Sequence, residues 1–159
     1  MRAVLILLMF TVFVGFSCKK EETPGLSFEE QISLDSAAIA AYLDANNITN
    51  AITDRTGYIK YVLHEEGTGI APFLSDSVEV SYKGRLLDTG EEFDSGEHTE
   101  FRVNGLITGW QIVLTEMQEG DSVTMYIPSG YAYGKNGSGD KIPANANLIF
   151  DMRLHRVFQ

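Results

Sequence analysis

The chain has 159 residues, a net charge of -10 and 44% hydrophobic residues, which suits one compact domain with some additional sequence. Its 12 basic residues against 22 acidic ones disfavour nucleic-acid binding and electrostatic attachment to anionic lipid, because both need clustered lysine and arginine. The single cysteine excludes an intramolecular disulfide and a zinc site built from several thiolates.

The first residues have the character of an export signal. Arg2 precedes an apolar run over residues 3–16, which has the length of a signal-peptide core and is too short for an ordinary membrane span. Val14-Gly15-Phe16-Ser17-Cys18 resembles a bacterial lipoprotein signal of the Bacteroidetes type, in which the thiol carries a lipid. The alternative is an ordinary secretory peptide with an incidental cysteine. We predict a signal peptide over residues 1–17 and lipidation of Cys18, which implies an exported protein anchored in the bacterial cell envelope, on the periplasmic or surface face of the outer membrane.

A polar segment and one helix follow. Residues 18–32 are largely charged or polar, which indicates a flexible tether, and residues 33–56 hold a helix and a linker. The helix is predicted from the apolar residues Ala38, Ile39, Tyr42 and Leu43, with Ser33 or Asp35 as its N-cap. A helix of this length is marginally stable alone, so its apolar stripe should pack on the following domain or on a second copy of the chain, which leaves a homodimer open.

After Gly57 the pattern changes to period two. Apolar and polar residues alternate over residues 59–64, 78–83, 122–127 and 148–155, as expected for half-buried antiparallel strands. The turn signals Asp88-Thr89-Gly90 and Glu119-Gly120-Asp121 favour hairpins and meanders over crossovers.

One segment of this region has helical spacing instead. Its apolar positions are Leu106, Trp110, Val113, Leu114 and Met117, and Asn104 is placed to cap the helix. The sequence therefore predicts an α+β domain over residues 57–159, an antiparallel twisted β-sheet wrapped around one short α-helix and preceded by an N-terminal helix.

Residues for nucleophilic, metal or phosphate chemistry are sparse. His64, His98 and His155 are dispersed, without metal-ligand spacing. The glycine pairs at residues 67–69 and 137–139 lack the strand-to-helix context of a phosphate-binding loop. The acidic residues Glu91, Glu92, Asp94, Glu97 and Glu100 fit a solvated face better than a weak cation site. We therefore expect neither a metal nor a cofactor.

Aromatic residues gather beside glycines in several turns. A cluster of rings is consistent with a plain core, but rings with polar handles also build an apolar pocket with a few oriented hydrogen-bonding groups. The segments are Tyr82-Lys83-Gly84, Phe93-Asp94-Ser95-Gly96, Phe101, Gly109-Trp110 and Tyr131-Ala132-Tyr133-Gly134.

From about Gly57 to the C-terminus, the sequence resembles the FKBP-type peptidyl-prolyl cis-trans isomerases. The motifs that carry the resemblance, in order, are Val80-Ser81-Tyr82-Lys83-Gly84, Gly90-Glu91-Glu92-Phe93-Asp94-Ser95, Leu106-Ile107-Thr108-Gly109-Trp110, Tyr131-Ala132-Tyr133-Gly134 and the run from Ile142 to Asp151. Each motif alone is weak, and together they are specific.

The resemblance implies an FKBP-like fold and a role for each pocket residue. Trp110 would form the floor of a proline pocket, with Tyr82, Phe93, Phe101 and Phe150 as its walls, Leu106 and Ile107 as its rim, and Ile142 as a further substrate contact. The Ile107 N–H and the Tyr133 hydroxyl would donate to the substrate. Asp94 would either act at the pocket edge or orient Tyr82. Val103 and Lys141 depart from the family pattern, which leaves open the preference for the residue before proline and the binding of macrolide-type inhibitors.

The resemblance further implies that the protein accelerates Xaa-Pro rotation in exported, proline-containing clients and so assists their folding. An isomerase of this kind needs no nucleophile, which agrees with the sparse chemistry. Two alternatives remain at this point: a non-catalytic proline-binding or chaperone module, and an interaction protein that dimerises through the helix at residues 33–46.

Overall fold

The computed structural model describes residues 26–159. The elements are α1 (Phe28–Ala45), β1 (Ile52–Thr53), β2 (Lys60–Glu65), β3 (Ser77–Leu86), β4 (Glu92–Arg102), the 3₁₀ turn η1 (Val103–Gly105), α2 (Thr108–Leu114), β5 (Ser122–Ile127), the 3₁₀ turns η2 (Ser129–Tyr131) and η3 (Gly134–Asn136), and β6 (Leu148–Phe158). The predicted signal peptide and Cys18 lie outside these residues. Between Leu26 and Gln159, no helix is long and apolar enough to span a bilayer.

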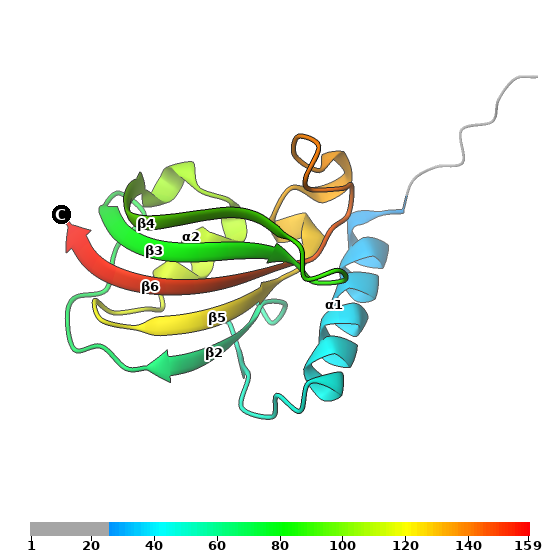
Figure 1. Cartoon of the computed structure of the whole chain (residues 1–159), viewed down its shortest axis with the longest axis horizontal. Helices are drawn as coiled ribbons and strands as arrows, with labels where there is room; N and C mark the ends of the chain where they lie inside the picture. The colour runs from blue at the N-terminus through cyan, green and yellow to red at the C-terminus, as the bar shows by residue number, and fades with distance from the viewer. Residues whose placement is uncertain (1–25) are drawn as a thin grey trace, which may run out of the picture.

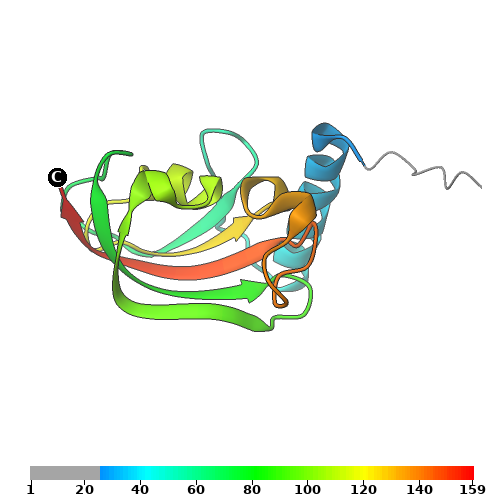
Figure 2. The ribbon, with the colours of Figure 1, turned by 90° about the horizontal axis from the view of Figure 1, so that it is seen from above.

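The strands form one curved sheet in which every pair is antiparallel, in the order β1-β2-β5-β6-β3-β4. The short helix α2 lies against one face of this sheet, and α1 stands at one end of it (Figures 1 and 2). The predicted fold class is therefore confirmed.

The connections differ partly from the prediction. β3 and β4 form the expected hairpin around Asp88-Thr89-Gly90, where Gly90 has a φ of +71°. Glu119-Gly120-Asp121, however, joins α2 to β5, and β6 lies between β5 and β3. The expectation of meanders without crossovers is wrong here because β6 begins with three buried residues in succession, Leu148, Ile149 and Phe150, and such a strand belongs in the middle of a sheet.

β4 was not predicted as a strand because most of its side chains are exposed and polar. It forms an edge of the sheet and carries Glu92, Asp94, Glu97 and Glu100 on its exposed positions. Charged side chains on an edge strand oppose pairing with another chain, so Glu92, Glu97 and Glu100 form a solvated surface, as predicted, whereas Asp94 accepts a hydrogen bond from Tyr82.

Two apolar clusters cover the two faces of the sheet. The main core lies on the α2 face and includes Val123, Met125 and Ile127 of β5. The alternate residue Tyr126 belongs to a second cluster with Ile39 and Leu43 of α1. Because successive side chains of a strand point to opposite faces, α1 covers the other face there. β5 is thus buried on both faces, not half-buried as predicted.

α1 begins earlier than the sequence pattern suggested. Its N-cap is Ser27, whose hydroxyl accepts from the Glu30 N–H while the Glu30 side chain accepts from the Ser27 N–H. This capping box, visible as Ser-x-x-Glu in the sequence, shortens the predicted tether. Neither Ser33, which is exposed, nor Asp35, which is buried, caps the helix. Its buried stripe packs on the domain itself and consists of Ile32, Asp35, Ile39 and Leu43.

α2 is shorter than predicted. It begins at Thr108 after Ile107, its N-cap, and Asn104 lies in η1 without capping it. Leu106 has extended backbone angles, φ -92° and ψ 170°, so it is not part of the helix. The extended pair Leu106 and Ile107 therefore forms the entry to the helix, and this segment reaches the candidate site.

Candidate functional site

A small aromatic cavity of about 130 Å³ lies between α2 and the sheet. Segments far apart in the sequence contribute to it: β3, β4, β6, the start of α2 and the loop after η2. Its nine lining residues were all among the predicted site residues: Tyr82, Phe93, Asp94, Phe101, Leu106, Ile107, Trp110, Tyr133 and Phe150.

Trp110 is the centre of this ring cluster and is only 4% exposed. Its ring centroid lies 5.1 Å from Tyr82, 5.9 Å from Phe101 and 5.0 Å from Phe150, each in an edge-to-face arrangement. Phe93 packs against Phe150 in the same way at 5.5 Å. Edge-to-face packing stabilises aromatic clusters beyond their buried area, so the apolar walls are held in fixed orientations.

Gly84 makes this packing possible. It pairs with Asp94 of β4 and with Phe150 of β6. A Cβ atom at this position would lie 2.6 Å from Phe93 Cζ and 2.7 Å from Phe150 Cε1. The absence of a side chain therefore lets both rings meet over the strand.

Tyr82 and Asp94 bring the polar groups of the cavity together. The Tyr82 hydroxyl donates to Asp94 Oδ2 at 2.9 Å across the β3–β4 pair. Burial, this hydrogen bond and the carboxylate charge raise the pKa of Tyr82 to about 12. Burial and the Asp94 charge also raise the pKa of Tyr133. Both hydroxyls therefore keep their protons at neutral pH; that of Tyr82 donates to Asp94, and that of Tyr133 can donate to a ligand.

The Tyr82 pKa gives a prediction for alkaline titration. We expect one phenol to ionise near pH 12, and Tyr82→Phe to remove that step from the ultraviolet difference titration. Because the folded pKa lies above the ordinary value of 10.0, the stabilisation from protonated Tyr82 is complete below pH ~10 and is lost between pH ~10 and ~12. An unchanged titration curve for Tyr82→Phe would contradict this assignment, and Tyr58→Phe is a control at a more exposed tyrosine.

The rim carries an unsatisfied backbone donor. The Ile107 carbonyl accepts from the N–H groups of Trp110 and Gln111, and the Gln111 side chain donates to the Leu106 carbonyl at 2.7 Å. The Ile107 N–H, by contrast, meets no acceptor among residues 26–159. The rim is thus held from α2 while one N–H remains available to a ligand.

Ile142 lies beside the aromatic cavity and does not line it. It contributes to an adjoining cavity of about 250 Å³ that shares Phe93, Asp94 and Tyr133 with the first. Lys141 lines this second cavity and donates from Nζ to the Phe93 carbonyl at 3.1 Å. Val103, the other departure from the family pattern, is fully buried in the core.

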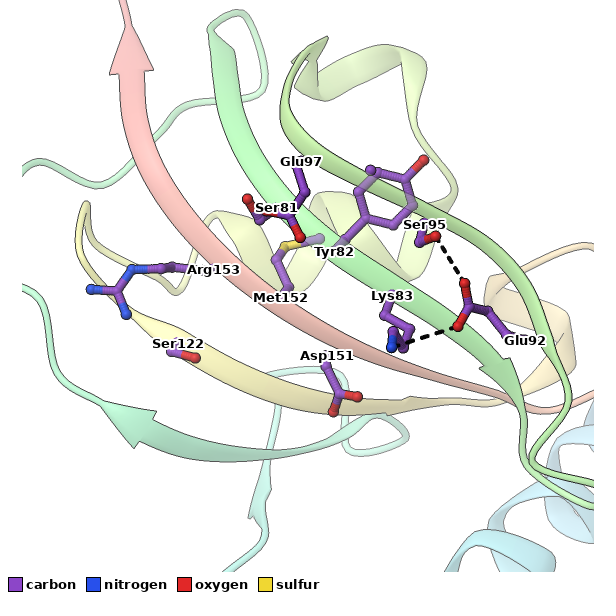
Figure 3. A pocket seen from close by; sticks show the side chains of 11 residues that line it. Ser81, Tyr82, Lys83, Glu92, Ser95, Glu97, Ser122, Asp151, Met152 and Arg153 are labelled. Carbon is purple, nitrogen blue, oxygen red and sulfur yellow. Dashed lines mark hydrogen bonds and ion pairs between the residues drawn. The ribbon is translucent and has the colours of Figure 1, made fainter.

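A wider hollow of about 630 Å³ has a different character (Figure 3). It is lined largely by polar side chains, among which Lys83 pairs with Glu92 at 3.6 Å and Ser95 donates to Glu92 at 2.8 Å. Lys83 alternates along β3 with Tyr82 and Gly84, so it points to the face opposite the aromatic cavity. This open, internally paired surface lacks the features of an apolar site.

Each histidine forms a hydrogen bond with a side chain on the adjacent strand. His64 bonds Thr124, His155 bonds Ser81, and His98 bonds Glu79. Across the described part of the chain, no group of three or more histidine, cysteine, aspartate or glutamate residues is arranged to hold a metal ion.

The sequence interpretation missed the contact between α1 and the loop that carries Tyr133. Asp35 is 2% exposed, and its Oδ2 accepts from the Ser129 N–H at 2.8 Å and from the Ser129 hydroxyl at 2.6 Å. Gln31 donates to the other carboxylate oxygen at 2.7 Å. Only the position of an aspartate within the apolar stripe of a helix hinted at this contact, and its partner lies 94 residues away.

Comparison with known proteins points to one family. The sequence model of FKBP-type peptidyl-prolyl cis-trans isomerases matches residues 70–155. A probable FKBP-type isomerase FkpA of Neisseria meningitidis is 36% identical over 121 residues, which are 74% of this chain and 44% of the relative. The 22 kDa FKBP-type isomerase of Escherichia coli is 37% identical over 120 residues, which are 73% of this chain and 58% of the relative. The chain thus spans about half the length of these relatives.

Solved structures of related proteins have the same fold. A peptidyl-prolyl cis-trans isomerase of Pseudomonas syringae is 31% identical and superposes with a TM-score of 0.72, covering 84% of this chain and 98% of that one. FkpA of Escherichia coli is 32% identical with a TM-score of 0.68, covering 84% of this chain and 74% of that one.

Proposed function

Because the chain belongs to the family of FKBP-type peptidyl-prolyl cis-trans isomerases, we propose that it catalyses the rotation of Xaa-Pro peptide bonds in proline-containing polypeptides. The observation that carries this proposal is the aromatic cavity, in which nine residues from distant segments surround a space of about 130 Å³. The alternative is a module that binds proline segments without catalysis.

The physical basis is the resonance of the amide bond. Rotation faces a barrier of about 18–20 kcal/mol because the planar amide has partial double-bond character, and the uncatalysed flip at proline takes about 10–100 s. The planar form is charge-separated, so a dry apolar pocket favours the twisted transition state, in which conjugation is broken. Each ~1.4 kcal/mol gained in this way accelerates the reaction about tenfold.

Each cavity residue has a role in this proposal. Trp110 supports the proline ring from below, and Tyr82, Phe93, Phe101 and Phe150 surround it. The free Ile107 N–H and the Tyr133 hydroxyl hold the carbonyls that flank the rotating bond. Asp94 accepts from Tyr82 and keeps that hydroxyl away from the apolar walls.

A peptide assay tests the activity directly. We expect the protein to accelerate isomerisation of Xaa-Pro peptides in protease-coupled or NMR exchange measurements. The triple variant Tyr82→Phe, Asp94→Val, Phe150→Tyr should lose most of this activity while its circular dichroism stays native. An inactive wild-type protein that still binds proline peptides would support the non-catalytic alternative, and an undiminished triple variant would refute the assigned site.

Lys141 gives a prediction about the residue before proline. Its ammonium group borders the cavity next to the proline pocket, so it should favour an acidic residue there. Exposed charge pairs contribute about 0.2–1 kcal/mol, and we therefore expect Lys141→Ile to lower the kcat/KM ratio of Glu-Pro to Leu-Pro peptides about two- to fivefold. Lys60→Ile, at a lysine of β2 that lines neither cavity, should leave the ratio unchanged. An equal effect of both variants would contradict a local role.

The cellular setting is also a proposal. Export and a lipid anchor at Cys18 are supported by the signal-like residues 1–17 and by a relative named outer membrane protein MIP from Legionella longbeachae, which is 34% identical over 134 residues. Labelled palmitate should be incorporated into the wild-type protein and not into Cys18→Ala. Incorporation by the variant would refute this site of attachment.

A further inference from the structure

A second groove, of about 310 Å³, lies beside the loop that carries Tyr133. Its apolar side chains are those of Leu26, just before α1, and Phe28, the first residue of α1. The other lining residues are Gln31, Ser129, Gly130, Gly134, Lys135 and Asn145. Figure 2 shows this end of α1 next to the segment that contains η2 and η3. Leu26 and Phe28 precede residues 70–155, so this part of the groove lies outside the region that the family model matches.

The apolar side chains of the groove are about half exposed, and one of them is held by an aromatic contact. Leu26 is 56% exposed and Phe28 is 52% exposed. The edge of the Phe28 ring nevertheless packs on Tyr131 with 6.2 Å between centroids, and Tyr131 in turn stacks on Tyr58 at 5.8 Å. A Cβ atom on Gly130 would lie 2.7 Å from Phe28 Cε2. The loop thus leaves room for this ring.

A buried hydrogen-bonded contact joins α1 to the loop beside the groove. Asp35 of α1 accepts two hydrogen bonds from Ser129, which is fully buried at the start of η2. These hydrogen bonds connect the helix that carries Phe28 to the loop that carries Gly130.

The groove and the proline cavity share no lining residue, but they adjoin at one loop. Tyr133 lines the aromatic cavity, and the next residue, Gly134, lines the groove. A polypeptide that places a proline in the cavity can cross Tyr133 within a few residues, since an extended chain advances roughly 3.3 Å per residue. An unfolded client offers the apolar side chains that complement Leu26 and Phe28.

We propose that this groove binds an apolar or aromatic side chain of the client polypeptide, a few residues away from the isomerised proline. The proposal rests on the proposed isomerase function and extends its binding site onto α1. The client would be an extended chain, held at its proline by the aromatic cavity and at one apolar residue by the groove.

The test compares short and long peptides on the full chain. The short peptide has four residues around one Xaa-Pro bond, and the long peptides add a single phenylalanine two, four or six residues before or after the proline. We expect at least one spacing to lower KM about five- to tenfold, as for partial burial of one side chain. The double variant Leu26→Ala, Phe28→Ala should lose this gain and keep the kcat/KM of the short peptide.

Leu34→Ala provides the matched control. Leu34 lies on α1 like Phe28 and is 56% exposed, the same as Leu26, but it does not line the groove. It should retain the full gain of the long peptide. In ¹⁵N–¹H spectra, the amides of Gly130 and Gly134 should shift with the long peptide and remain unshifted with it in the double variant.

Three results would overturn the inference. One is activity on the short peptide with no decrease in KM for a long peptide at any spacing. This result would refute the groove alone, whereas an isomerase proposal that is wrong would leave even the short peptide without turnover. Another is an equal loss in Leu34→Ala. The third is a different occupant, shown by a dimer in sedimentation that Leu26→Ala, Phe28→Ala dissociates, or by a gain in long-peptide binding when residues 18–25 are removed.

Discussion

Replacement of Gly84 by alanine is expected to disrupt the aromatic cavity and to lower kcat/KM on Xaa-Pro peptides at least tenfold. The new Cβ would lie 2.6 Å from Phe93 and 2.7 Å from Phe150. Phe93 and Phe150 pack edge-to-face on each other and Phe150 also packs on Trp110, so relief of these contacts would push the rings into the cavity that they line. Overpacking of this kind typically destabilises a fold by about 1–3 kcal/mol, which urea denaturation measures.

Gly105→Ala is the matched control for this prediction. Gly105 lies in η1, close in sequence to the same cavity, and no atom lies within 4 Å of the Cβ that alanine would add. We expect its kcat/KM and its free energy of unfolding to stay close to those of the wild type. An active Gly84→Ala protein with native stability would show that the two rings can separate without loss of the pocket.

Replacement of Asp35 by alanine should have the second large effect, although Asp35 touches no residue of the aromatic cavity. The change removes a buried carboxylate that accepts two hydrogen bonds from Ser129. Hydrogen bonds to charged groups contribute about 1.5–3 kcal/mol each, so we expect a loss of roughly 3 kcal/mol in the free energy of unfolding. Asn147 still accepts from the Ser129 N–H at 3.0 Å, which limits the loss.

The functional consequence of Asp35→Ala should appear in the loop after Ser129. Tyr133 follows four residues later and lines the proline cavity, so its freedom should increase and kcat should fall about three- to tenfold at temperatures where the variant is fully folded. Asp35→Asn should recover much of both effects, because its amide oxygen can accept from Ser129. Asp44→Ala, at an exposed aspartate of the same helix, serves as the control, and a similar loss there would argue against a specific contact.

The pocket and the surface around it have opposite characters. The face of the sheet away from α2 carries the paired charges of Lys83 with Glu92 and of Arg85 with Asp151. The cavity side has a single carboxylate, Asp94, bonded to Tyr82. A strongly acidic chain can therefore offer an apolar site, because strand alternation sends the charges to the other face.

Local pattern was sufficient where burial is one-sided or a motif is contiguous. The alternation at residues 78–83 and 148–155 predicted β3 and β6, and every residue of the aromatic cavity was predicted through the family resemblance. Pattern failed for β4, whose exposed acidic side chains show little alternation, and for Tyr126 of β5, whose face is covered by α1. Periodicity records which positions are apolar, and it contains no information on which distant element will cover them.

The amino-acid sequence by itself determined the α+β class, because that class depends on residue types at short, regular spacings. Through the family resemblance it also predicted the residues that line the aromatic cavity, and the export signal over residues 1–17 stays a prediction. Only the tertiary structure decided that β6 lies between β5 and β3, that α1 covers the second face of the sheet, and that Asp35 holds Ser129. These contacts join segments up to 94 residues apart, and their partners are selected by shape and by the need to satisfy buried polar groups. The groove between α1 and the Tyr133 loop follows from the same long-range packing.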